Sequence, residues 1–285
     1  MYHYKFSSID RTEWLRSICE VRKLDLSNEE GITFELDDIP MDSIKPEHLV
    51  TFACLIDELK NKKGVPRASI QGGETGAGIM ETFNLPDYWG GGKNYSRSKR
   101  ATVLNLQRVI KEEKDFHAIN VANYLRNTFF QKKDLSPVSS SLTEAYYNIF
   151  DHANADGNAF SMLEFDETKK ELHVAICDFG IGIARSVKDF LNEDISDIEA
   201  LEKALEDNFT IRSTIHNSGQ GLGNILSSCT DKDYLWIICN SAAVAANSSS
   251  RRFRKLDFEF VGTLIFYSMS LSHFDDEEVL DEFDL

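Results

Sequence analysis

Glu144, Asn148 and His152 recur at four-residue intervals in the segment LTEAYYNIFDHA (142–153). On a helix, this spacing places the three side chains on one polar stripe, with Asp151 beside it. An amide oxygen is a hard ligand suited to Mg²⁺, and a carboxylate can accept a proton from an attacking water or hydroxyl. The segment is therefore a candidate for metal-assisted transfer chemistry, and a solvated helix face is the alternative.

A second candidate segment, DFGIGI, directly follows the apolar run LHVAIC, which predicts a strand. Asp178 then lies at a strand end, where a buried carboxylate can accept hydrogen bonds from an exocyclic amine and reject ligands that lack one. Gly180 and Gly182 let the backbone approach a flat ring closely. A tight left-handed turn after the strand is the alternative.

A third candidate segment is rich in glycine. In HNSGQGLGN, Gly219, Gly221 and Gly223 alternate with Gln220 and Leu222 directly before an expected helix. Backbone N–H groups in such a loop, together with the helix N-terminus, form a natural phosphate cradle. The segment has no G-K-[ST] and no strand immediately before it, so it is neither a P-loop nor a dinucleotide fingerprint.

Hydrophobic periodicity predicts the elements that position these segments. The expected helices cover residues 46–62, 102–114, 116–131, 141–153, 196–208 and 223–229. The expected strands cover residues 31–37, 65–70, 159–165, 171–177, 235–240, 255–260 and 262–269. Ser141 and Glu144 stand in the S-x-x-E register of a capping box at the start of their helix. Adjacent antiparallel strands mixed with helices predict an α/β sandwich, with helices laid over one sheet face.

Together with VGTLIF (261–266), these segments resemble the boxes of the Bergerat-fold ATPases, the GHKL superfamily of DNA gyrase B, Hsp90, histidine kinases and MutL. Residues 142–153 are similar to the N box, DFGIGI to the G1 box, GQGLGN to the G2 box, and Gly262-Thr263 to the terminal glycine–threonine pair. The resemblance covers about residues 140 to 270 and implies a C-terminal α/β sandwich whose mixed sheet carries helices on one face.

The resemblance also implies ATP and Mg²⁺ as cofactors. By position, Asn148 would coordinate Mg²⁺, and Asp178 would bind the adenine amino group with support from Thr263. Glu144 would be the general base, with Asp151 as a nearby acid. The other cofactor-binding positions that the resemblance implies are His152, Gly180, Gly182, Gly219, Gln220, Gly221, Leu222 and Gly223.

Within the superfamily, the pattern E-A-x-x-N-x-x-x-H is similar to the N box of the bacterial anti-sigma serine kinases. A lid would cover residues 185–218, with Arg212 and His216 as phosphate contacts. His117 lacks the setting of a histidine-kinase phosphoacceptor, and only about fifteen residues follow the resemblance, too few for a transducer domain. The expected function is a Mg-ATP-binding ATPase or serine-kinase-like switch, whose lid closure controls a protein partner.

The N-terminal half is similar to a STAS domain over about residues 30–90, in FELDDIPMDSIKPEHLVTFACLIDELKNK. Ser43 before the helix is either a phosphorylation site or a helix cap. The expected organisation is a STAS-like α/β domain at 1–92, a helical linker at 93–139, the ATP-binding domain at 140–271 and an acidic tail at 272–285.

The composition of the chain argues against two classes of partner, nucleic acids and membranes. The chain has 285 residues, with 31 Lys and Arg against 47 Asp and Glu, and a formal net charge of −16. Such a surface repels phosphate backbones and anionic lipid, so we expect neither nucleic acid nor a membrane as a partner. Five widely spaced cysteines without a C-x-x-C predict reduced, mostly buried thiols. With no signal peptide and no run near the ~20 apolar residues of a membrane span, the expected location is cytoplasmic.

Several alternatives remain open at this stage. The chain could be a non-catalytic, ATP-bound scaffold or regulatory subunit of a bacterial regulatory or anti-phage complex, and a homodimer is compatible with either function. GGETGAG (72–78) lacks the lysine of a nucleotide loop and is interpreted as a flexible turn. The locally basic KNYSRSKR (93–100) fits a solvated linker or a contact for nucleic acid that stimulates ATPase activity.

Overall fold

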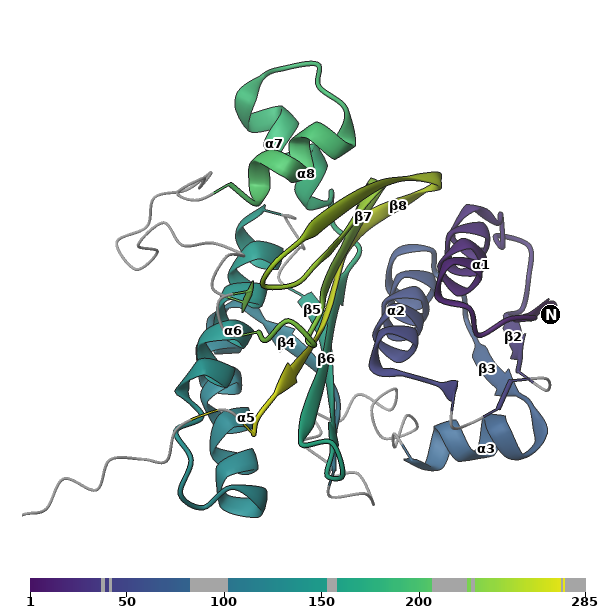
Figure 1. The fold of residues 1–285 in the computed structure, drawn as a ribbon. Coiled ribbons are helices and arrows are strands. Elements are labelled where there is room, and N and C mark those ends of the chain that lie inside the picture. The colour runs from purple at the N-terminus through teal and green to yellow at the C-terminus, as the bar shows by residue number, and fades with distance from the viewer. Residues whose placement is uncertain are drawn as a thin grey trace, which may run out of the picture.

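The structure is a computed structural model, and it describes residues 1–36, 39–40, 43–82, 102–152, 158–206, 225–226, 229–272 and 274. The described residues form one three-stranded sheet and one five-stranded sheet, with helices between and outside them (Figure 1). The mixed α/β class expected from the sequence is confirmed. No described helix combines the length and the apolar character needed to cross a bilayer.

The N-terminal part alternates strands and helices. Its elements are β1 (Tyr2–Lys5), α1 (Arg11–Lys23), β2 (Ile32–Glu35), α2 (Pro46–Asp57), the π-helical turn η2 (Glu58–Lys62), β3 (Ala68–Gln71) and α3 (Gly73–Thr82). The three strands are parallel in the order β1-β2-β3, and the helical crossovers between them are what parallel pairing requires. The strand–helix–strand expected between residues 31 and 70 is confirmed, while β1 and α1 were not expected.

The second part builds the larger sheet and the helices on one face of it. Its elements are β4 (Val103–Ile110), the 3₁₀ turn η3 (Lys111–Glu113), α5 (Lys114–Phe129), α6 (Ser136–Tyr147), the π-helical turn η4 (Asn148–His152), β5 (Asn158–Asp166), β6 (Glu171–Asp178), α7 (Ile183–Leu191), α8 (Asp197–Ala204), β7 (Leu235–Ala246) and β8 (Arg251–Ser270). The strands pair antiparallel in the order β4-β5-β6-β8-β7.

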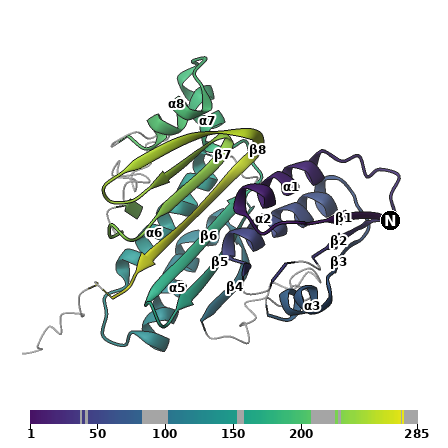
Figure 2. The same cartoon turned by 45° about the vertical axis from the view of Figure 1, so that its right-hand side comes forward.

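Both faces of the five-stranded sheet are buried. Alternate side chains of each strand point to opposite sides of the sheet, and each side packs into a different core. On β6, Val174 and Ile176 belong to the core that includes α5, α6, α7 and α8. Ala175 and Cys177 belong to the second core, which includes α1, α2 and β2. Helices α1 and α2 therefore lie between the two sheets, as both views show (Figures 1 and 2).

Two expected helices differ from the structure. The helix expected over 102–114 is wrong, because VLNLQRVI forms β4 and pairs with β5. The segment 93–139 therefore supplies an edge strand of the sheet and is not a purely helical linker. The helix expected from Ser141 begins earlier, at Ser136, with Pro137 in its first turn, a position that proline favours. Ser141 thus lies inside α6, and the expected capping box with Glu144 is wrong.

Two further expectations change in detail, and one is confirmed. The two strands expected over 255–260 and 262–269 form the single strand β8. The segment 72–78, interpreted as a flexible turn, instead begins α3 directly after β3. All five cysteines are free and buried, as expected. The segments 93–100 and 275–285 lie outside the described residues.

The β7–β8 pair bends, and its two ends have different neighbours. Its register shifts on either side of Asn240, which has a left-handed backbone with φ 51°. Strand β8 pairs with β6 only from Thr263 to Ser270, whereas its pairing with β7 continues to Arg251. The curved pair, which reaches past the end of β6, is visible in Figure 2.

Candidate functional site

Asp178 ends β6 with a carboxyl group that is only partly satisfied. The side chain is 1% exposed, and its Oδ1 accepts a hydrogen bond from the Gly180 amide at 2.6 Å. Its Oδ2 is buried and accepts no hydrogen bond from any described residue. Burial raises the pKa of Asp178 from 3.8 to about 8, although the Gly180 amide and the nearby Thr263 oppose the shift. The carboxyl group is therefore mostly protonated at neutral pH in the ligand-free protein.

Thr263 lies directly opposite Asp178 in the β6–β8 register. Its Oγ1 is also buried, without a hydrogen bond of good geometry to the described part of the chain. The neighbouring Gly262 has φ +129°, and a Cβ there would lie 2.3 Å from the Asp178 carbonyl oxygen. Only glycine fits this close approach. The result is a pair of buried polar atoms on adjacent strands, one at the end of β6 and one within β8, that form no hydrogen bond of good geometry with the described residues.

The loop after Asp178 is held by a residue of β7. Gly182 precedes α7 with φ +85°, and a Cβ there would lie 2.4 Å from Oδ1 of Asn240. The Asn240 Oδ1 accepts a hydrogen bond from the Arg185 amide at 3.2 Å, and its Nδ2 donates to the Ile181 carbonyl at 2.9 Å. Asn240 therefore fixes both the loop and the first turn of α7 against the sheet.

Asn148 and Glu144 interact at the junction of α6 and η4. The Asn148 side chain is 5% exposed, and its Nδ2 donates to the Glu144 carbonyl at 2.7 Å and to the Glu144 Oε1 at 2.8 Å. Burial raises the pKa of Glu144, and the hydrogen bond from Asn148 opposes the shift. A carboxylate whose pKa moves toward neutrality is better suited to accept a proton. Asp151 and His152 continue η4, but their side chains are not among those described.

The predicted N-box and G1-box residues lie on the same side of the large sheet. Ile149 of η4, Ile183 of α7 and Ile176 of β6 belong to one core. Because side chains two residues apart on a strand share a face, Asp178 points toward the same helical layer as Ile176. Thr263 likewise shares its face with Ile265, another member of that core. Turn η4 also contacts α7 directly.

The predicted G2 box cannot be placed in the same way. The G2-box residues and the two expected phosphate contacts of the lid lie outside the described part of the chain: Gly219, Gln220, Gly221, Leu222, Gly223, Arg212 and His216. The expected lid, 185–218, is described as far as residue 206, where it contains most of α7 and all of α8. The helix expected over 223–229 is described as helical at Ile225 and Leu226.

The N-terminal part contacts this site from the second face of the large sheet, through residues that the sequence analysis missed. The Arg22 guanidinium lies 3.8 Å from the centroid of the Phe179 ring, next to Asp178. Its Nη1 donates to the carbonyl of Val261 at 2.5 Å, and its Nη2 forms an ion pair with Glu58 at 2.9 Å. Arg22 therefore connects α1 with the end of β6 and with the part of β8 that lies beside it, the two places that carry the candidate site.

The sequence analysis also missed Cys54 and Asn240. A local sequence signal exists for Asn240 but not for Cys54. The Cys54 thiol of α2 donates to the carbonyl of Cys177 at 3.4 Å, immediately before Asp178. No local pattern indicates Cys54 or Arg22, because their partners are distant in sequence. Asn240 does leave a signal, because it is a polar residue that interrupts the apolar strand LWIICNSAAVAA.

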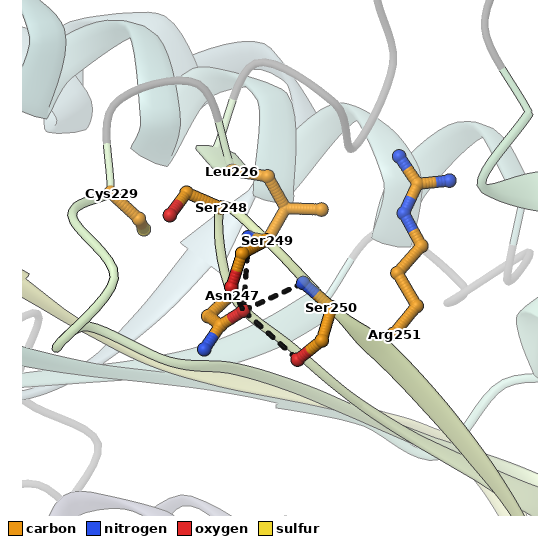
Figure 3. Close-up of a pocket in the computed structure, with 7 residues that line it drawn as sticks. All are labelled: Leu226, Cys229, Asn247, Ser248, Ser249, Ser250 and Arg251. Carbon is orange, nitrogen blue, oxygen red and sulfur yellow. Dashed lines mark hydrogen bonds between the residues drawn. The ribbon is translucent and has the colours of Figure 1, made fainter.

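A separate pocket of about 350 Å³ lies at the β7–β8 turn (Figure 3). It is lined by Leu226, Cys229, Asn247, Ser248, Ser249, Ser250 and Arg251. None of the residues predicted for the nucleotide site lines this pocket. Among the side chains that the structure describes, no group of three His, Cys, Asp or Glu is arranged to hold a metal ion.

Comparisons with known proteins give no assignment for this chain. No protein-family model matches it, and no curated protein is significantly similar to it. The functional interpretation therefore depends on the four sequence segments and on the geometry of Asp178, Thr263, Glu144 and Asn148.

Proposed function

We propose that the chain binds Mg-ATP as a GHKL-type protein and works as an ATPase or a serine-kinase-like switch. The observation that carries the proposal is a pair of buried atoms without a hydrogen bond of good geometry to the described residues, Asp178 Oδ2 at the end of β6 and Thr263 Oγ1 opposite it within β8. Buried polar atoms are nearly always hydrogen-bonded. A ligand with an exocyclic amine beside a ring nitrogen, as in adenine, supplies a donor for the carboxylate and an acceptor for the hydroxyl.

Asn148 and Glu144 of the helical layer have the chemistry needed at the phosphate end of such a ligand. Because Asn148 Nδ2 donates to Glu144, the amide oxygen is the Asn148 atom that would bind Mg²⁺. When bound, Mg²⁺ neutralises charge on the phosphates and helps to position them. Glu144 Oε2 is then the group that accepts the proton of an attacking water or serine hydroxyl.

The switch part of the proposal concerns the expected lid. Its described helices, α7 and α8, contact β7, and α7 also contacts the N-box turn η4. Asn240 attaches the start of α7 to the sheet. A ligand that orders the loop after Asp178 would therefore change the surface of α7 and α8 that a protein partner meets, a known form of switching.

Calorimetric titration with ATP and Mg²⁺ tests the adenine contact. The Asp178→Asn variant presents an amide donor to the adenine amine, so we expect its ATP affinity to fall at least about 100-fold. Asp233→Asn is the matched control, because Asp233 is also buried but accepts hydrogen bonds from Thr230 and Ser270. Equal ATP affinity in wild type and Asp178→Asn would refute the assignment.

Turnover is tested separately with γ-labelled ATP. We expect Glu144→Gln to bind ATP and lose label transfer, because the amide cannot accept the proton. Label in free phosphate identifies an ATPase, and label on a serine of another protein identifies a kinase. Tight binding by wild type without any transfer would instead support the ATP-bound regulatory subunit.

A further inference from the structure

The first residues of β8 form a cluster of positive charge on an acidic protein. Arg251, Arg252, Arg254 and Lys255 are all exposed, although the chain has a net charge of −16. The Arg251 Nη1 donates to the Leu205 carbonyl at 2.9 Å. The other three side chains form no ion pair with the part of the chain that the structure describes.

The backbone of this cluster lies at a sheet edge. Over residues 251–255, β8 pairs with β7 on one side, whereas its pairing with β6 begins only at Thr263. The N–H and C=O groups on its second side therefore have no strand partner among the described residues. An open edge of this kind is a template for another extended chain. We call residues 251–255, with this open side, the basic edge.

The turn that leads into the basic edge is polar and is held together by hydrogen bonds to one side chain. Asn247 Oδ1 accepts hydrogen bonds from the Ser249 amide at 3.0 Å and the Ser250 amide at 2.8 Å, and from both serine hydroxyls. The pocket of Figure 3 opens here, with Arg251 at its margin. The basic edge is therefore presented by an ordered hairpin turn, which lowers the entropy lost when a partner binds.

We propose that the basic edge docks an extended acidic peptide segment by strand addition. Alternate side chains of a strand lie about 6.6 Å apart on one face, so acidic residues at alternate positions of an added strand match the spacing of Arg252 and Arg254. The open edge also offers main-chain donors and acceptors, which a peptide backbone pairs with and a nucleic-acid backbone does not.

The chain itself contains a segment of the required chemistry. Residues 275–285, DDEEVLDEFDL, carry seven carboxylate side chains in eleven positions. A synthetic peptide with this sequence is therefore the probe for the basic edge. The matched control peptide replaces every Asp and Glu with Asn and Gln, which removes the charge and keeps the length and the apolar residues.

The test measures binding of the labelled peptide to the full chain by fluorescence anisotropy at low salt. We expect Arg252→Glu with Arg254→Glu to weaken binding by at least about tenfold, because two attractive pairs become repulsive. Lys60→Glu with Lys132→Glu is the control for net charge, since both lysines are exposed and lie elsewhere. We expect this control to bind like wild type, and hydrogen exchange at residues 251–255 to slow when peptide is bound.

The full chain carries its own acidic segment, which would compete with the probe. Binding only after the seven carboxylates of 275–285 are changed to amides, and loss of that binding with the Arg252 and Arg254 reversals, also supports the proposal. Equal binding by the reversed variant, equal binding of the uncharged peptide, or no peptide binding to either form overturns it. A single-stranded oligonucleotide that binds through Arg252 and Arg254, where the peptide fails, replaces it with a nucleic-acid surface.

Discussion

Replacing Asp178 with asparagine should stabilise the protein at neutral pH, even though it removes a proposed ligand contact. The pKa of this carboxyl group rises from 3.8 to about 8 on folding, because the group is buried at the end of β6. A group whose pKa is raised on folding contributes its full stability below the unfolded pKa, and that contribution is lost as the pH rises toward the folded pKa. Wild type should therefore lose stability between about pH 4 and pH 8.

The size of the effect follows from the pH range. At pH 7 the unfolded carboxyl is ionised and the folded one is mostly protonated, a difference of roughly three pH units at about 1.4 kcal/mol each. Keeping Asp178 protonated therefore costs about 4 kcal/mol of folding free energy at pH 7. Asparagine does not titrate, and its carbonyl oxygen can still accept the hydrogen bond of the Gly180 amide.

Urea denaturation followed by circular dichroism at pH 5, 6, 7 and 8 measures this difference. We expect Asp178→Asn and wild type to have similar free energies of unfolding only near pH 4 and below, so that they already differ at pH 5 and separate further up to about pH 8. The reasoning would be refuted by parallel pH profiles of wild type and Asp178→Asn, or by a less stable variant at pH 7.

The remaining predictions concern the ligand and the contacts around it. The proposed adenine amine binds the ionised form of Asp178, so ATP affinity should rise with pH up to about 8. At neutral pH, binding should then release close to one proton from this carboxyl group. Calorimetry in buffers of different ionisation enthalpy measures this release. Gly262→Ala should destabilise the protein by about 3 kcal/mol in chemical denaturation, because its Cβ would lie 2.3 Å from the Asp178 carbonyl at a backbone angle that alanine rarely adopts. Arg22→Met should cost about 3 kcal/mol, because Glu58 is left largely buried without its charge partner, and the double variant Arg22→Met with Glu58→Gln should recover part of the loss.

The elements that local patterns predict well are those whose pairing is also local. Strands β5 and β6 alternate clearly and are joined by a short turn, so their pairing follows from the sequence. VLNLQRVI is ambiguous, because its apolar residues fit a helical as well as a strand period. Its partner β5 lies about fifty residues away, and only that distant pairing makes it the strand β4.

The same distinction applies to the site. The motifs locate Asp178 and Thr263, and antiparallel pairing of β6 and β8 brings them opposite each other. The contacts of Arg22 and Cys54 were not predicted, because they depend on how α1 and α2 pack on the second face of the sheet. Asn240 holds a position that only the bend of β7 explains.

Because both faces of the large sheet are buried, the C-terminal part should not be stable when it is expressed without the N-terminal part. A fragment that begins at residue 102 would lose α1 and α2 and would expose Phe160, Met162 and Phe266, which belong to the second core. Exposed apolar surface of that extent promotes aggregation. The N-terminal part therefore shares a core with the large sheet and is not a detachable module, so mutations in α1 or α2 should lower the solubility and the yield of the whole chain.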